Sequence, residues 1–286
     1  MIQHGQTLSA VRKEMVRLLS GLYPPDEATA ITRLVLDHLG FPPKDLILKG
    51  DLPADRQTLM QINKIVTELK GYRPVQYVLG VAGFHDLLFA VDESVLIPRQ
   101  ETEELVDMII KENSDSSKIF CDLGTGSGCI AVSLAHALPG AEVHATDISQ
   151  EALATARKNA ERNGVKITFH HADLLSDSPF PKELRFDILV SNPPYVTEAE
   201  KSLMDPHVKD HEPSRALFVP DRDPLVFYRR IAGLAPACLN TGGCVWLEIN
   251  ERFGRETADI FARQGFGEVS VLKDLRQKDR FIKATL

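Results

Sequence analysis

The chain has 286 residues, of which 43% are hydrophobic and 26% are charged, as expected for a globular protein with one large domain or a main domain and a small appendage. Its net charge of −7 argues against a protein whose main task is to hold nucleic-acid phosphates, and no apolar run is long enough to cross a membrane. Because the N-terminus also lacks the apolar core of a signal peptide, we expect a cytoplasmic protein with no membrane partner and no direct nucleic-acid partner. The cysteines form no Cys-x-x-Cys pair, and we interpret them as reduced packing residues: Cys121, Cys129, Cys238 and Cys244.

The first 80 residues are predicted to be helical. Within Asp26–Leu39, apolar side chains recur at helical spacing after two prolines and an acidic first turn, and Gly40 follows as a stop signal. Thr7–Leu22 and Ala54–Leu69 carry similar apolar stripes. We predict that a small helical bundle buries these stripes in a domain of residues 1–80.

Residues 81–98 are predicted to link this domain to a second one. The stretch Gly71–Pro98 mixes glycine, proline, aromatic and β-branched residues. Leu87–Val91 and Val95–Ile97, separated by a short acidic turn, predict a β-hairpin. Gln100–Lys111 then begins with glutamates, as the N-terminus of a helix prefers.

Strands and helices are predicted to alternate through the second domain, residues 99–286. The strands are Lys118–Asp122, Ala141–Asp147, Lys166–His170, Phe186–Val190, Gly243–Ile249, Glu268–Lys273 and Phe281–Leu286, and the helices between them are Cys129–Ala137, Gln150–Asn163, Asp223–Ala237 and Arg252–Gln264. This pattern is typical of an α/β, Rossmann-like fold with a mostly parallel sheet covered on both faces. Because ligands bind at the carboxyl ends of such strands, the side chains found there are the candidate site residues.

A glycine-rich loop follows the first of these strands. It reads Asp122-Leu123-Gly124-Thr125-Gly126-Ser127-Gly128, and glycines at such a turn let the backbone approach a ligand closely. Asp147 ends the next strand, where a carboxylate commonly accepts hydrogen bonds from ribose hydroxyls. Together they indicate a site for an adenosine-containing ligand, with a tight turn that binds no ligand as the alternative.

The spacing of the glycines favours S-adenosylmethionine over a dinucleotide. A dinucleotide fingerprint ends in Gly or Ala where this chain has Cys129, whereas the spacing here is Gly-x-Gly-x-Gly after an acid. S-adenosylmethionine has no pyrophosphate to hold, and it carries a cationic sulfonium and an amine. Asp173, at the end of the third strand, can receive the adenine edge, or it can be a helix cap or a solvated acid.

The fourth strand ends in Ser191-Asn192-Pro193-Pro194-Tyr195. Two prolines remove two backbone donors and hold Asn192 extended. The carbonyl groups of the Asn192 side chain and the Pro193 backbone can accept both hydrogens of a planar NH₂ group, and Tyr195 offers it a flat face. Acceptors placed in this way favour the sp³ character that a nitrogen develops as it receives a methyl group. A simple strand terminator accounts for the prolines but not for Asn192 and Tyr195.

These motifs resemble those of class I methyltransferases that act on amide or exocyclic nitrogen. The likeness to one family, the protein-(glutamine-N5) methyltransferases specific for peptide chain release factors, extends over nearly the whole chain. It is carried by Arg73–Gly80, Phe84, Leu88-Phe89, Val95–Glu103, His211-Glu212-Pro213, Ala216-Leu217, Tyr228-Arg229, Lys273-Asp274-Leu275 and Asp279-Arg280.

The resemblance implies a helical N-terminal domain, a hairpin and a seven-stranded methyltransferase domain. It also implies that S-adenosylmethionine methylates the glutamine of a Gly-Gly-Gln tripeptide in release factors, giving S-adenosylhomocysteine without a metal. The implied cofactor contacts are Gly124, Thr125, Gly126, Ser127, Gly128, Asp147, Asp173, Leu174 and Asn192. The implied contacts to the glutamine amide are Asn192, Pro193, Pro194 and Tyr195, of which Asn192, Pro193 and Tyr195 are the catalytic residues. We further expect the N-terminal domain to bind the release factor away from the tripeptide.

The chain departs from the pattern of this family at three places. Gln100 stands where Pro is frequent, and Arg276-Gln277 stands where the late loop often has Gly. Leu174 replaces an aromatic residue that many relatives carry near the adenine, so we expect an aliphatic contact there.

Other functions stay open. An N6-adenine methyltransferase of DNA or RNA would use the same Asn-Pro-Pro-Tyr chemistry, but it should carry a basic flank or an added recognition domain, and this chain is acidic. A glutamine methyltransferase of a ribosomal protein would differ only in its recognition surface. A non-catalytic binder of an adenosine ligand is a third possibility. An oxidoreductase is disfavoured because Cys129 breaks the dinucleotide fingerprint and Ser191–Tyr195 would have no role.

Two histidine pairs and one arginine complete the candidates. His207 and His211 are four residues apart, but the glutamate of a zinc-protease motif is missing and prolines bracket the segment, so we predict a loop without a metal. We interpret His170-His171 as packed or exposed histidines. Arg99, together with Glu101 and the glutamates after it, forms either a capped helix start or part of a rim that faces the substrate.

Overall fold

The structure is a computed structural model that describes residues 2, 5–113, 117–176, 180 and 184–286. Two compact units divide the chain, one of Met1–Gly80 with Pro206–His211 and the other of Val81–Asp205 with Glu212–Leu286. Among the helices of the described residues, none is both long and apolar enough to span a lipid bilayer.

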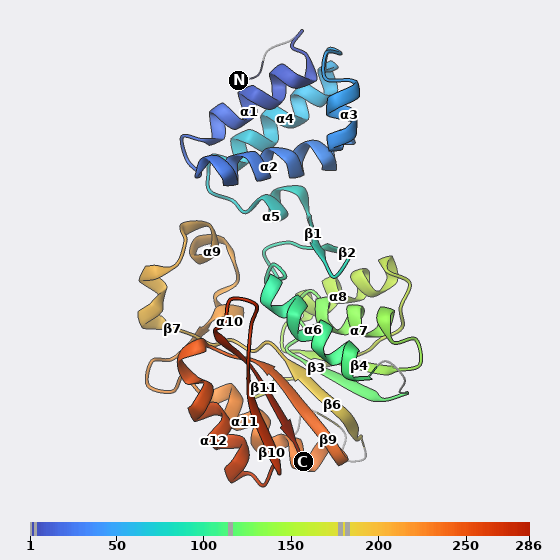
Figure 1. The fold of residues 1–286 in the computed structure, drawn as a ribbon, viewed down its shortest axis with the longest axis vertical. Helices are drawn as coiled ribbons and strands as arrows, with labels where there is room; N and C mark the ends of the chain where they lie inside the picture. Colours follow the sequence, from blue (N-terminus) through green and yellow to red (C-terminus); the bar gives the residue numbers. More distant parts are fainter. Residues whose placement is uncertain (1, 3–4, 114–116, 177–179, 181–183) are drawn as a thin grey trace. The chain divides into compact units, whose positions relative to one another are not determined.

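The first unit is helical (Figure 1). Its helices are α1 (Leu8–Leu19), α2 (Pro25–His38), α3 (Pro43–Leu48), α4 (Arg56–Leu69), α5 (Val75–Leu79) and α9 (Pro206–His211). Capping side chains begin two of them, because Thr7 accepts a hydrogen bond from the backbone of Ala10 and Asp55 accepts one from that of Thr58. The apolar stripes of α1, α2 and α4 are buried in one core, which confirms the predicted helices.

Helix α9 differs from what the sequence predicts. Its segment is a helix and not the expected loop, because Pro206 occupies its first position, where the missing N–H of proline costs no hydrogen bond. It also belongs to the first unit, where the ring of His207 lies 6.4 Å from that of Tyr23, although it falls inside the predicted range 99–286. Within the described residues, His207 and His211 are not part of a group of three or more side chains placed to hold a metal.

The second unit is built on a seven-stranded, mostly parallel sheet, as predicted. The strand order is β10 (Glu268–Lys273), β11 (Asp279–Thr285), β9 (Leu239–Glu248), β6 (Phe186–Ser191), β3 (Ile119–Leu123), β4 (Glu142–Asp147) and β5 (Thr168–His171). Neighbours from β9 to β5 pair in parallel, whereas β11 is antiparallel to both β9 and β10. The chain runs outward from β3 to β5 and then returns to β6 on the other side of β3, so a ligand crevice is expected between the ends of β3 and β6.

Helices cover both faces of this sheet (Figure 1). On one face lie α6 (Gln100–Asn113), α7 (Cys129–Ala137) and α8 (Gln150–Arg162), and on the other lie α11 (Val226–Cys238) and α12 (Gly254–Arg263). Leu123, Leu189 and Leu247 point toward the second face, where they share one core with Tyr228 and Ile231 of α11. The remaining short elements are β7 (Val196–Thr197), the 3-10 helix η1 (Glu198–Leu203), α10 (Ser214–Leu217), β8 (Phe218–Val219) and the 3-10 helix η2 (Glu251–Phe253).

The hairpin is formed by a different pair of segments from the predicted one, because Leu87–Ala90 pairs with the strand before it and not with the segment after it. It pairs β1 (Val81–Phe84) with β2 (Leu87–Ala90), and Val95–Ile97 is not a strand. The turn residues His85 and Asp86 have φ angles of 49° and 59°, which match the left-handed pair that a two-residue hairpin turn requires. The sequence pairs Asn-Gly and Asp-Gly predict such a turn, whereas the pair His-Asp does not.

Candidate active site

A cavity of about 610 Å³ opens at the carboxyl ends of β3, β4, β5 and β6, and all of its lining residues belong to the second unit. Its size is typical of a site for a small-molecule ligand. Most of the site residues expected from the sequence line it: Gly124, Thr125, Gly126, Ser127, Asp147, Asp173, Leu174, Asn192, Pro193 and Pro194. Gly128 and Tyr195 are not among the described residues that line it.

The glycine-rich loop forms one wall of this cavity. The backbone N–H groups of Gly124 and Thr125 donate to the carbonyl of Thr146 at 2.9 and 2.8 Å, which ties the loop to β4. Gly126 has a φ of 54°, and a Cβ atom there would meet nothing within 4 Å. Since Gly126 also lines the cavity, its missing side chain leaves open space for a ligand.

Gly128, in contrast, allows two helices to pack closely. Its φ is 81°, and a Cβ atom there would lie 3.1 Å from the Cβ of Ala156 on α8. Glycine at this position therefore allows α7 to begin close against α8.

Replacing Gly128 with Ala is expected to lower the free energy of unfolding by about 2 to 3 kcal/mol. The left-handed backbone costs about 1 to 2 kcal/mol for a residue with a Cβ, and the close contact with Ala156 adds to that cost. Chemical denaturation measures this loss. Gly126→Ala is the matched control, because it carries the backbone cost without the contact; an equal loss for the two variants would contradict the packing explanation.

Asp147 joins the glycine-rich loop to the end of β4. Its Oδ2 atom accepts from the N–H of Gly126 and its Oδ1 atom from the N–H of Ser149, both at 2.8 Å. Burial raises the pKa of Asp147, and these backbone hydrogen bonds oppose the rise. Each carboxylate oxygen keeps a second lone pair, so Asp147 can still accept hydrogen bonds from ligand hydroxyls in the cavity.

The residues that follow β5 line another part of the cavity. Asp173 caps a turn, because its Oδ1 atom accepts from the N–H of Leu175 at 2.8 Å, and it lines the cavity as well. Leu174 is buried, and its carbonyl accepts from Arg230 Nε at 2.9 Å. Phe227 of α11 lines the same cavity. Phe227 therefore supplies the aromatic ring that the residues after Asp173 lack, and the sequence around Asp173 could not predict it because Phe227 lies far away in the chain.

Asn192 is anchored on a buried carboxylate that the sequence did not single out. Asn192 Nδ2 donates to Thr102 Oγ1 at 3.0 Å, and Thr102 donates to Glu248 Oε2 at 2.6 Å. The Tyr195 hydroxyl donates to the other oxygen of Glu248 at 2.9 Å. Burial raises the pKa of Glu248, and the hydrogen bonds from the two hydroxyls oppose the rise. The signal available in the sequence was a single acid, Glu248, inside the otherwise apolar stretch Val245–Ile249.

A second hollow, of about 40 Å³, adjoins the large cavity. Leu96, Arg99, Asn192, Pro193 and Ala216 line both, and the small hollow is completed by Tyr195, Val196 and Leu217. Asn192 and Pro193 therefore stand between the two spaces. Tyr195 faces the small one.

Arg99 lines both the large cavity and the small hollow. It donates to Glu212 Oε1 at 2.6 Å, and the backbone N–H of Ile97 donates to the other oxygen at 3.3 Å. The Glu212 side chain is 1% exposed, so this ion pair firmly joins the segment before α6 to the loop before α10. The glutamate that pairs with Arg99 is Glu212, while Glu103 accepts from the backbone of His85.

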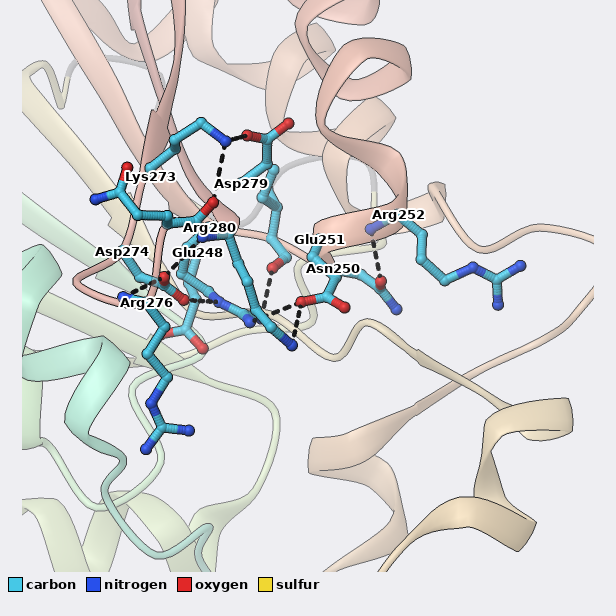
Figure 2. A network of polar contacts seen from close by, with 12 residues as sticks. Glu248, Asn250, Glu251, Arg252, Lys273, Asp274, Arg276, Asp279 and Arg280 are labelled. Carbon is cyan, nitrogen blue, oxygen red and sulfur yellow. Dashed lines mark hydrogen bonds and ion pairs between the residues drawn. The ribbon is translucent and has the colours of Figure 1, made fainter.

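Polar contacts brace the strand end that carries Glu248 (Figure 2). Arg280 donates to Asp274 and to the carbonyl of Ile249, both at 3.3 Å, and Glu251 lies 3.5 Å from the same guanidinium. These contacts hold β11 and the end of β9 together beside Glu248.

Asp274 also stabilises the loop between β10 and β11, residues 274–278. Its Oδ1 atom accepts from the N–H groups of Arg276 and Lys278 at 2.9 Å each. Gln277 between them has a φ of 64°, a conformation that favours glycine. Gln277 therefore adopts a backbone conformation that glycine would adopt with less strain.

Comparisons with known proteins place this geometry in context. Residues 10–80 match the PrmC N-terminal domain, and residues 100–208 match the Methyltransferase small domain. The release factor glutamine methyltransferase of Bacteroides thetaiotaomicron is 45% identical over 267 residues, which cover 93% of this chain and 95% of that protein. The enzyme of the same name from Flavobacterium psychrophilum is 43% identical over 277 residues, which cover 95% of this chain and 96% of that protein.

A solved structure shares the fold. The 16S rRNA N2 G1207 methyltransferase of T. thermophilus, in complex with AdoMet and guanosine, has a TM-score of 0.53 at 20% identity. The match covers 72% of this chain and 49% of that chain. It confirms the class I methyltransferase sheet and carries no information on the substrate.

Proposed function

The chain belongs to the release factor glutamine methyltransferase family, and from this premise we propose that it methylates the side-chain amide nitrogen (N5) of the glutamine in the Gly-Gly-Gln tripeptide of peptide chain release factors. S-adenosylmethionine is the methyl donor and S-adenosylhomocysteine the product. One observation carries the proposal, namely that Asn192 and Pro193 line both the large cavity and the small hollow. A donor in the first and a glutamine amide in the second would meet at the same two residues. The substrate assigns the reaction to the cytoplasm, where release factors act.

The residues of the large cavity fit S-adenosylmethionine. Asp147 retains lone pairs for ribose hydroxyls, Gly126 leaves room beside the backbone, and Leu174 and Phe227 offer apolar surface for an adenine ring. The acidic side chains of Asp147 and Asp173 suit a cationic ligand. When bound, S-adenosylmethionine supplies an electrophilic methyl group on a sulfonium.

Asn192, Pro193 and Tyr195 prepare the acceptor. An amide nitrogen is a poor nucleophile because its lone pair is delocalised into the carbonyl. The Asn192 and Pro193 carbonyl oxygens accept the two amide hydrogens and so favour the tetrahedral nitrogen over the planar one. Tyr195 forms the wall of the small hollow and restricts the orientation of the amide, and alignment of the reacting atoms supplies much of the remaining rate. No general base is required, because the proton can leave after methyl transfer.

The direct test is transfer of labelled methyl from S-adenosylmethionine to a purified release factor. The same factor with its tripeptide glutamine changed to Ala is the matched control, and DNA and ribosomal proteins are incubated in parallel. We expect label on the intact factor and none on the variant. Label on DNA alone would mean that the site reads an adenine amine, and label on a ribosomal protein alone would move the substrate to the ribosome.

We also propose that the helical unit binds the release factor away from the tripeptide, because three residues offer little specificity. Apolar side chains are exposed in this unit, with Ile47 at 84% and Leu48 at 79% in α3. Exposed apolar side chains that cluster on a surface often mark a site of protein contact.

Replacing Ile47 and Leu48 together with Asp is therefore expected to raise KM for the whole factor by about tenfold, the loss of roughly 1.4 kcal/mol of binding. KM for a short peptide that contains the tripeptide should stay unchanged. Leu88→Asp, at a side chain that is also exposed but lies in the second unit, is the control. Steady-state kinetics with the two substrates decide, and equal effects on factor and peptide would contradict this role. Substitution is preferable to deletion of residues 1–80, because deletion would strip α9 of its packing partners.

A further inference from the structure

We propose that Glu248 is a positioning residue that determines which end of the Asn192 side-chain amide faces the substrate. It does so through Thr102, by setting the direction in which a chain of hydrogen bonds runs. This inference rests on the proposed function, because the orientation of Asn192 matters when a substrate NH₂ group is bound beside it.

The chain of hydrogen bonds begins at the carboxylate of Glu248, which has no hydrogen to donate. Glu248 is 1% exposed, and its two oxygens accept from the hydroxyls of Thr102 at 2.6 Å and Tyr195 at 2.9 Å. An ionised carboxylate can only accept, so both hydroxyls must donate toward it. Burial raises the pKa of Glu248, whereas the hydrogen bonds from the two hydroxyls and the nearby guanidinium of Arg280 oppose the rise and favour the ionised carboxylate.

Thr102 passes this direction on to Asn192. Its hydroxyl has a single hydrogen, which is committed to Glu248, so toward Asn192 its oxygen can only accept. The NH₂ group of Asn192 therefore donates to this oxygen, with Nδ2 at 3.0 Å from Thr102 Oγ1. Thr102 is buried, and a buried polar group left without its partner costs about 1 to 3 kcal/mol, which disfavours a reversed amide.

The amide orientation decides the chemistry of the site. With its NH₂ group turned to Thr102, the Asn192 Oδ1 atom is left for the cavity and hollow that Asn192 lines. A reversed amide would place donor against donor at the substrate nitrogen and would remove one of the two acceptors. Glu248 therefore keeps an acceptor in place without touching the substrate, and through Tyr195 the same carboxylate also holds the wall of the small hollow.

The test compares four variants of the full chain in methyl transfer to the release factor. Glu248→Gln keeps the size of the side chain but adds an NH₂ group that can donate to Thr102, which frees the Thr102 hydroxyl to donate to Asn192 and lets the amide reverse. We expect kcat to fall by about 100-fold, the loss seen when one preorganised polar contact to a transition state is removed. Thr102→Val should cause a similar fall, whereas Thr102→Ser, which keeps the hydroxyl, should stay close to wild type. Glu251→Gln is the matched control, since Glu251 forms its ion pairs with Arg280 and Lys278 and not with Thr102.

Binding and folding are measured on the same samples. The Kd for S-adenosylmethionine and the melting temperature should stay close to wild type in every variant that folds, so that the effect appears in kcat. If Glu248→Gln does not fold, the comparison of Thr102→Val with Thr102→Ser tests the inference on its own. Activity near wild type in Thr102→Val, or an equal loss in Thr102→Ser and Thr102→Val, would overturn the inference. A wild-type enzyme that leaves the factor unlabelled would instead reject the proposed function.

Discussion

Replacing Asn192 with Ala is expected to lower kcat by about 100- to 1000-fold, while the Kd for S-adenosylmethionine changes far less. The reason is that Asn192 lies where the large cavity meets the small hollow, held by Thr102 so that its carbonyl is available to the substrate amide. Removing this acceptor takes away an interaction that strengthens as the nitrogen becomes tetrahedral, so the loss should appear in kcat. Single-turnover methyl transfer and calorimetric titration of S-adenosylmethionine measure the two quantities separately.

Asn192→Asp is the informative companion to this variant. Aspartate keeps the acceptor oxygens, but it adds a charge beside the cationic sulfonium and has no hydrogen for the Thr102 oxygen. It should bind S-adenosylmethionine at least as tightly as wild type and still transfer methyl slowly, since the added charge stabilises the ground state. Unchanged kcat in Asn192→Ala would remove Asn192 from the mechanism, and unchanged kcat in Asn192→Asp would contradict the effect assigned to the added charge.

Replacing Asp147 with Asn is expected to raise the Kd for S-adenosylmethionine by about 10- to 100-fold, which corresponds to the loss of roughly 1.5 to 3 kcal/mol in hydrogen bonds to a charged group. The amide would also turn an NH₂ group toward the backbone N–H of either Gly126 or Ser149, both of which now donate to the carboxylate. The glycine-rich loop would thus lose one tie to β4, in addition to the contact with the ligand.

Calorimetric titration measures this change, with Glu151→Gln as the control. Glu151 lines the same cavity but is exposed, and in the structure its carboxylate accepts from the Ser149 hydroxyl and not from the loop. A similar Kd for wild type and Asp147→Asn would show that Asp147 serves only to hold the loop.

The sheet could be predicted because each of its strands carries its own local signal. Phe186–Val190 is an unbroken apolar run that ends in prolines, and such a run fits a strand buried on both faces. The hairpin was misplaced because its turn depends on left-handed conformations at His85 and Asp86, which their residue types do not announce. Helix α9 was missed because two prolines around a short segment resemble a loop, although Pro206 is compatible with the first turn of a helix.

The candidate site was predictable where its residues follow strands directly, as Asp147 and Asn192 do. Thr102, Phe227 and Glu248 were missed because they come from two helices and a distant strand, and only tertiary packing brings them to the site. Sequence spacing also cannot separate a glycine that leaves room for a ligand, as at position 126, from one that lets two helices approach, as at position 128.

The central claim is that this site methylates an amide nitrogen of glutamine. Its most direct test is tandem mass spectrometry of a release factor incubated with the enzyme and S-adenosylmethionine that carries a deuterated methyl group. We expect the heavy methyl group on the side-chain nitrogen of the tripeptide glutamine, and its absence when Asn192 is replaced with Ala. A methyl group on any other residue, or an equal yield from the Asn192→Ala enzyme, would contradict the claim.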